Sequence, residues 1–146
     1  MTNKGTRRLI AEEKWCAERR KEVRAYLTRQ RIRHGRISSW PAWHVDPYLS
    51  VWAIESAVRP GWVGWWVICG DLPTDYISAS RIKHPRTALR VFAKRWEKVA
   101  NCMRRGRAHP TVKIGERSYW PQLEPLLRRR AKLLAQFADD KNTWKK

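Results

Sequence analysis

The chain has 146 residues, with 32 Lys or Arg against 13 Asp or Glu, so its formal net charge is +19. Its 42% of hydrophobic residues suffices for one core, which excludes disorder over most of the chain and predicts a single domain over 1–146 with short frayed tails at about 1–8 and 139–146. No run approaches the roughly 20 apolar residues that span a bilayer, and residues 1–13 lack the apolar block of a signal peptide, so we expect a cytoplasmic protein without a membrane partner.

The first predicted element is a helix over 11–31. Trp15, Val23 and Leu27 recur at helical spacing, and acidic side chains lie in the first turn, where the helix dipole favours them. Gly35 marks a position beyond the end of this helix.

Two strands are predicted next, over 48–56 and 62–69, where β-branched and aromatic residues are frequent. The Arg-Pro-Gly sequence at 59–61 is a turn signal, so the two strands are expected to form an antiparallel hairpin. Residues 76–79 are a candidate for a short third strand.

Two helices complete the predicted order. Over 86–103, Leu89, Phe92 and Trp96 lie three and four residues apart, which is typical of an amphipathic helix. Residues 121–138 repeat this pattern, with prolines confined to the first turn or its approach. The order α-β-β-(β)-α-α predicts an α+β fold in which a small antiparallel sheet packs with three amphipathic helices.

The three cysteines predict neither a disulfide framework nor a zinc ribbon. Cys16, Cys69 and Cys102 lie far apart, form no Cys-x-x-Cys pair and cannot all pair within one chain. We therefore expect buried free thiols, no metal and no cofactor.

The charge is segregated along the chain. Residues 1–39 carry a net charge of +8 and residues 81–146 carry +14, whereas residues 40–80 carry −3 together with six of the ten tryptophans. The basic excess thus belongs to the predicted helices, and the predicted sheet is apolar and slightly acidic.

Four segments are long and rich in tryptophan. They are WCAERR at 15–20, WPAWHVDPYLSVWAIES at 40–56, PGWVGWWVICGDLPTDYIS at 60–78 and HPRTALRVFAKRW at 84–96. Over nearly its whole length the chain resembles a bacterial family of similar length that is known as a domain of unknown function. The resemblance implies a bacterial cytosolic protein, and it brings no activity, cofactor or catalytic residue.

Basic side chains form the strongest candidate site. Arg86, Arg90, Lys94 and Lys98 recur every four residues and form a stripe opposite the apolar helix face. The other basic candidates are Arg104, Arg105, Arg128, Arg129 and Arg130. A polyanion would relieve the repulsion within such a set by replacing counterions, although a solvated basic face would give the same pattern.

Trp65 and Trp66 are the aromatic candidates. Neighbouring strand positions point to opposite faces, so a sheet covered on one face would leave one ring partly in water, where it could stack on an unpaired base or anchor a protein partner. A sheet covered on both faces would instead bury both rings.

The acidic centre is a third candidate. Asp46, Glu55, Asp71 and Asp75 lie at or near strand ends, but no known nuclease or metal-binding spacing occurs, so these acids more often cap turns or pair with arginines. We expect a small non-enzymatic binding protein that contacts an anionic macromolecule, most often a nucleic acid, through its basic helices. The alternatives are a module for a specific protein partner, such as an acidic toxin or phage protein that it neutralises, and a hydrolase on the acidic centre.

Overall fold

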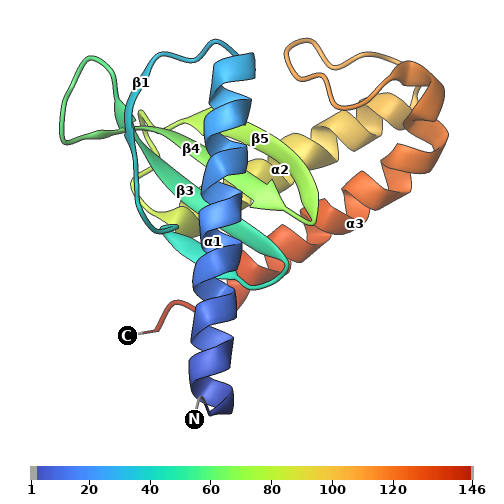
Figure 1. Ribbon diagram of the computed structural model, residues 1–146. Helices are drawn as coiled ribbons and strands as arrows, with labels where there is room; N and C mark the ends of the chain where they lie inside the picture. The colour runs from blue at the N-terminus through green and yellow to red at the C-terminus, as the bar shows by residue number, and fades with distance from the viewer. Residues whose placement is uncertain (1–2, 146) are drawn as a thin grey trace. The chain divides into compact units, whose positions relative to one another are not determined.

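The computed structural model describes residues 3–145 and divides the chain into two compact units, Met1–Pro85 and Arg86–Lys146. Within the described residues the element order is α-β-β-β-β-β-α-α, with one short 3-10 helix before the last helix. The expected α+β class is confirmed (Figure 1). The expected frayed tails include residues 1–2 and 146, which lie outside the described residues.

Unit 1 begins with helix α1, Lys4–Arg29. It starts seven residues earlier than the helical spacing predicts, because Asn3 caps it by accepting a hydrogen bond from the Thr6 backbone N–H at 2.8 Å. The added turns are exposed, with Leu9 and Ile10 facing solvent, so they carry no buried periodicity by which the sequence could reveal them.

The sheet of unit 1 has five strands. They are β1 His34–Ile37, β2 Trp43–Val45, β3 Leu49–Ser56, β4 Val63–Gly70 and β5 Leu72–Ser78. All pairings are antiparallel, in the order β1-β3-β4-β5, and β2 also pairs with β3. Since β4 occupies the other side of β3, β1 and β2 share one edge of that strand.

The predicted hairpin is β3 and β4, whereas the rest of the sheet differs from the prediction. β1 and β2 are strands that the sequence did not indicate, because four and three residues are too few for a visible alternation. The third predicted strand is β5, which begins at Leu72 rather than at position 76 and includes Pro73. A proline is tolerated there because β5 pairs only with β4 and forms an edge of the sheet.

Helix α1 packs across one face of this sheet (Figure 1). Val23 and Leu27 of α1 contact the inward side chains of Trp52 and Val67, and all four are fully buried. Three of the alternate side chains on β3 and β4, those of Leu49, Val51 and Ile68, are also fully buried, whereas the end of the hairpin near the turn is exposed at Val63.

Unit 2 consists of α2, Pro85–Arg104, the 3-10 helix η1, Arg117–Tyr119, and α3, Trp120–Asp139. The two long helices extend the predicted ranges by one residue at each end. They run antiparallel, since Arg86 near the start of α2 contacts Ala138 near the end of α3, and Arg104 at the end of α2 contacts Glu124 in the first turns of α3.

Candidate anion-binding groove

A groove runs between α2 and α3 within unit 2. It has a volume of about 660 Å³, and alanines form its small-residue lining: Ala93, Ala131 and Ala135. The charged lining comprises four cations and two acids: Arg90, Lys94, Arg128, Lys132, Glu97 and Asp139. We call this feature the α2–α3 groove. Small side chains between cations allow an anion to approach closely.

Two arginines of the predicted basic stripe have a structural role at one end of the groove. Arg86 donates from Nε to the Ala138 carbonyl at 2.6 Å, and Arg90 donates to the same oxygen at 3.5 Å. Arg90 also lies 3.6 Å from the Asp139 carboxylate. These contacts satisfy an unpaired carbonyl at the C-terminus of α3, where positive charge is also favoured by the helix dipole.

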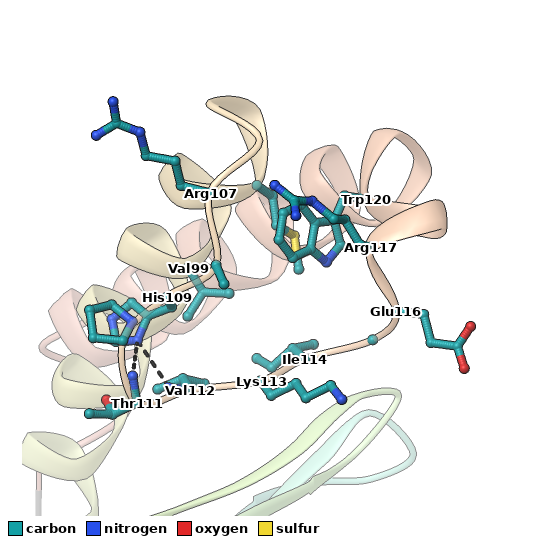
Figure 2. Close-up of a pocket in the computed structure, with 14 residues that line it drawn as sticks. Val99, Arg107, His109, Thr111, Val112, Lys113, Ile114, Glu116, Arg117 and Trp120 are labelled. Atoms are coloured by element: carbon teal, nitrogen blue, oxygen red, sulfur yellow. Dashed lines mark hydrogen bonds between the residues drawn. The ribbon is translucent and has the colours of Figure 1, made fainter.

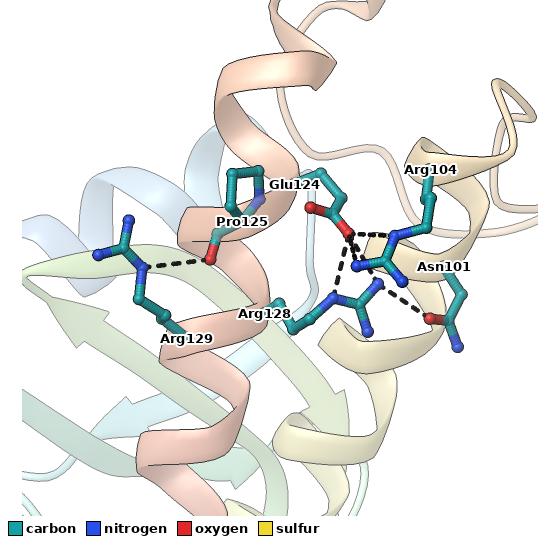
Figure 3. Close-up of polar contacts among 6 residues, drawn as sticks. All are labelled: Asn101, Arg104, Glu124, Pro125, Arg128 and Arg129. Carbon is teal, nitrogen blue, oxygen red and sulfur yellow. Dashed lines mark hydrogen bonds and ion pairs between the residues drawn. The ribbon is translucent and has the colours of Figure 1, made fainter.

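At the other end, Glu124 holds two predicted residues together. Its Oε1 accepts from Arg128 at 2.8 Å and from Arg104 at 3.0 Å, and Arg128 also donates to Asn101 (Figure 3). Hydrogen bonding from Arg128 is the largest effect that lowers the pKa of Glu124 below its ordinary value, with the nearby charges of both arginines adding to it. These arginines therefore join α2 to α3.

Lysines supply the unneutralised charge of the groove. Lys94 on α2 and Lys132 on α3 are exposed, and neither has an ion-pair partner within residues 3–145. Lys98 follows Lys94 one turn later and is also exposed. The structure therefore divides the predicted stripe into capping arginines and unpaired lysines.

The remaining basic candidates lie outside the groove lining. Arg105 is exposed after the end of α2, and Arg130 is half-buried on α3. Arg129 is exposed, donates weakly to the Pro125 carbonyl at 3.5 Å and points away from the Glu124 cluster (Figure 3). The three consecutive arginines of α3 thus point in different directions, as helical geometry requires.

Trp65 and Trp66 take opposite faces of β4, as strand alternation predicts. Trp66 is 3% exposed and its indole donates to the Ile82 carbonyl at 2.8 Å. Trp65 is half-buried against the α1 side of the sheet, lies edge-on to Tyr76 and donates to the Arg33 carbonyl. Trp66 is buried and Trp65 packs against Tyr76, so neither ring is an open stacking platform.

The exposed aromatic ring of the hairpin is Trp62, which strand alternation did not single out. Its exposed fraction is 56%, and the Arg59 guanidinium lies 4.0 Å from its ring centroid. Val58 and Val63 beside it are also exposed. The signal available in the sequence is the turn itself, since a ring next to Arg-Pro-Gly lies at the turn end of the hairpin.

Two of the four acidic candidates, Glu55 and Asp75, accept backbone hydrogen bonds. Glu55 accepts from the backbone N–H groups of Arg36 and Gly61, both at 2.9 Å, and these two bonds hold its pKa below the ordinary value. Asp75 is buried and accepts from the Tyr76 N–H, whereas Asp46 and Asp71 are exposed. The described residues contain no group of three or more His, Cys, Asp or Glu placed to hold a metal ion.

One histidine contact links α1 to β2. His44 Nε2 lies 2.5 Å from Glu12 Oε1, and the imidazole stacks against Trp15 with a centroid distance of 6.2 Å. Trp40 lies edge-on to the same imidazole. This contact fixes the short strand β2 to the helix.

Comparisons with known proteins identify a family and nothing further. A family model described as a domain of unknown function (DUF4826) matches residues 10–144. No curated protein and no solved structure matches the chain. Over residues 3–145, no helix combines the length and apolar character needed to cross a membrane.

Proposed function

The chain belongs to the DUF4826 family, and from the chemistry of its own surface we propose that it is a non-enzymatic cytoplasmic protein that binds a nucleic acid through the α2–α3 groove. The observation that carries the proposal is the pair of unpaired lysines, Lys94 and Lys132, one on each wall of the groove.

The charge of unit 2 supports this proposal. Residues 86–146 contain 17 basic and 5 acidic residues, a net charge of +12. Like charges this dense repel one another and hold counterions, and a phosphate backbone that replaces those counterions gains their release entropy. The alanine lining gives a phosphate room beside the lysine ammonium groups.

The test is a salt titration of binding to a short fluorescent single-stranded DNA of mixed sequence. The double variant Lys94→Gln/Lys132→Gln removes the unpaired lysines and leaves the capping arginines in place. Each lost phosphate contact should flatten the slope of log affinity against log salt by about 0.7, so the double variant should lose about 1.4.

A matched control removes the same charge elsewhere. Lys4 and Lys14 are exposed on α1 in unit 1, and Lys4→Gln/Lys14→Gln should retain the wild-type slope. Equal slopes for the two double variants would show that the groove is only a solvated face. Absence of binding by the wild-type protein to both single-stranded and duplex probes would refute the proposal outright.

A protein partner is the second candidate function, and the exposed end of the β3–β4 hairpin favours it. Val58, Trp62 and Val63 are 81%, 56% and 42% exposed, and Arg59 stacks on the tryptophan. Tryptophan and arginine are the side chains that most often dominate binding energy at protein interfaces. A partner captured after nuclease treatment, and lost with Trp62→Ala but not with Lys94→Gln/Lys132→Gln, would support this candidate over the first.

A further inference from the structure

In two cavities of this chain an arginine lies against the ring of a tryptophan, and the two rings differ in how open they are. In unit 2, the loop between α2 and α3 encloses about 570 Å³, and the Arg117 guanidinium lies 5.3 Å from the Trp120 ring centroid (Figure 2). Trp120 is half-buried and its Nε1 is fully buried, so this indole is part of the cavity wall. In unit 1, Trp62 lines a cavity of about 680 Å³ and is 56% exposed. Of these two rings, Trp62 is therefore the one that a ligand can contact.

Backbone hydrogen bonds fix the segments that line the cavity of unit 1. The Trp62 N–H donates to the Arg59 carbonyl at 3.1 Å, and the Trp62 carbonyl accepts from the Ser56 N–H at 2.8 Å. After β5, the Ala79 N–H donates to the Gly64 carbonyl at 3.0 Å, which joins this segment to β4. A site whose backbone is already ordered loses less entropy when a ligand binds.

One face of the Trp62 ring is covered by Arg59. The guanidinium lies 4.0 Å from the ring centroid, which is a stacking contact that leaves the N–H donors at the edge of the guanidinium available. Among residues 3–145, Arg59 has no ion-pair partner. Because Arg59 covers one face, the exposed surface of Trp62 belongs mainly to the opposite face and the edges of the indole. A planar group can stack on that open face.

The polar side chains that line this cavity can all donate hydrogen bonds. Arg59 and Lys83 are exposed cations, and among the described residues no carboxylate lines the cavity. Ser56 Oγ accepts from two backbone N–H groups of the turn, and Ser78 Oγ accepts from the Ser80 N–H. These bonds use lone pairs of the hydroxyl oxygens, so each O–H remains able to donate. Such a set of donors favours an anion with several oxygens, such as a phosphate.

We propose that this cavity binds an unpaired nucleotide of a single-stranded nucleic acid. The base stacks on the open face of Trp62, and phosphate oxygens accept from Arg59, Lys83 and the serine hydroxyls. A duplex offers no such base, because its bases are paired and stacked on one another. The inference rests on the proposed nucleic-acid binding, and it adds a second site and the form of nucleic acid that the chain selects.

The experiment compares two fluorescent strands with the full chain at one salt concentration. One is a short oligo(dT), and the other is an abasic strand of the same length, which keeps the phosphates and lacks the bases. The wild type should bind oligo(dT) about tenfold more tightly than the abasic strand, since stacking adds to the phosphate contacts. Trp62→Ala should bind both strands equally, and Trp62→Phe, which keeps a ring, should retain most of the difference.

Tyr48→Ala is the matched control. Tyr48 is 55% exposed and precedes β3, at the end of the hairpin far from the turn, so its loss should leave the preference for oligo(dT) unchanged. Lys83→Gln tests the phosphate contact without altering the ring. It should flatten the slope of log affinity against log salt by about 0.7 for either strand, whereas Lys14→Gln should not.

The preference for bases and the salt slope separate this site from the α2–α3 groove. Lys94→Gln/Lys132→Gln should weaken both strands by the same factor and keep the preference for oligo(dT). If this double variant flattens the salt slope while the wild type binds both strands equally, the groove stands and the Trp62 site is refuted. A wild-type preference retained in Trp62→Ala would also overturn the proposal. So would a protein partner that requires Trp62 when Trp62→Ala leaves binding of both strands unchanged.

Discussion

Burial separates the three thiols by their reactivity. Burial raises the pKa of Cys16 to about 11 and that of Cys69 to about 12, and the nearby carboxylate of Glu12 adds to the shift at Cys16. A thiolate, not a thiol, attacks disulfide reagents, so both residues should react slowly. Cys102 is only half-buried.

We therefore expect a single fast-reacting thiol when the native protein meets a disulfide reagent at mildly alkaline pH. Cys102→Ser should abolish the fast phase, and Cys69→Ser should leave it intact. Three equal rates in the absence of denaturant would contradict this assignment.

Tryptophans of the hairpin should differ sharply in their contribution to stability. Trp66→Ala opens a cavity and removes the hydrogen bond to Ile82, so it should lower the free energy of unfolding by about 3–5 kcal/mol. Trp62→Ala removes an exposed ring and should change stability by about 0.5 kcal/mol or less. Urea denaturation of the two variants measures the difference, and similar midpoints would show that Trp62 is buried in solution.

The basic stripe shows what sequence can and cannot predict about side chains. Four-residue spacing placed Arg86, Arg90 and Lys94 on one helix, and α2 confirms that helix. It did not reveal that Arg86 and Arg90 cap α3, because the capped carbonyl of Ala138 is 52 and 48 residues away. Partners so distant in sequence are chosen by tertiary packing, which periodicity within one helix does not encode.

At the scale of the helix, the cap on α3 gives a direct prediction. Arg86→Gln should lower the free energy of unfolding by about 0.5–1.5 kcal/mol, since the carbonyl loses its charged donor. Lys94→Gln, two turns later on the same helix, should have no comparable effect. Thermal unfolding of both variants at the same pH and salt concentration tests this prediction. Equal midpoints would show that the hydrogen bond from Arg86 to the Ala138 carbonyl does not stabilise the fold.

Glu124 makes the contact between α2 and α3 dependent on pH. Its pKa is lowered in the folded chain, so the stabilisation it provides is complete above its unfolded value near 4.5 and is lost as pH falls through the lowered value. The wild-type thermal midpoint should therefore fall more steeply below about pH 4.5 than that of Glu124→Gln.

Glu55 provides the internal comparison for this pH effect. The pKa of Glu55 is also lowered, through backbone hydrogen bonds from Arg36 and Gly61. Glu55→Gln should therefore also reduce the fall of the thermal midpoint at acidic pH, independently of Glu124→Gln. For Glu124 itself, equal pH dependence of the thermal midpoint in the wild type and in Glu124→Gln would show that its ion pairs with Arg104 and Arg128 contribute nothing to stability.

The five strands show which elements the sequence pattern can predict and which it cannot. Residues 49–56 and 63–70 were predictable because each is long, apolar and bounded by turn residues. β1 and β2 are strands only because the outer edge of β3 is available to them, which is a property of the assembled sheet. The sequence also does not predict the N-terminal turns of α1. These turns are exposed and bury too few side chains to produce a periodic hydrophobic pattern.

For the whole molecule, the net charge of +19 gives the excess of positive charge, but it does not show which basic residues lack an acidic partner. Ion pairs neutralise part of this charge at Arg90, Arg104 and Arg128. Among the described residues, Lys94 and Lys132 have no ion-pair partner, so their charges are not neutralised. Salt should accordingly stabilise the free protein by screening, while it weakens binding of a polyanion. A midpoint that falls with added salt would indicate that attractive pairs dominate instead.

The split edge of the sheet has a consequence for how this protein behaves when many copies crowd together. An uninterrupted strand edge is a template on which another chain can add a strand, and such addition leads to aggregation. Here the outer side of β3 is occupied by two strands of four and three residues, with Ser38 bonding the Ala53 carbonyl between them. On the opposite side, Pro73 removes one donor from β5. Crowded copies of the chain therefore meet at strand edges that are too interrupted for one sheet to extend into another.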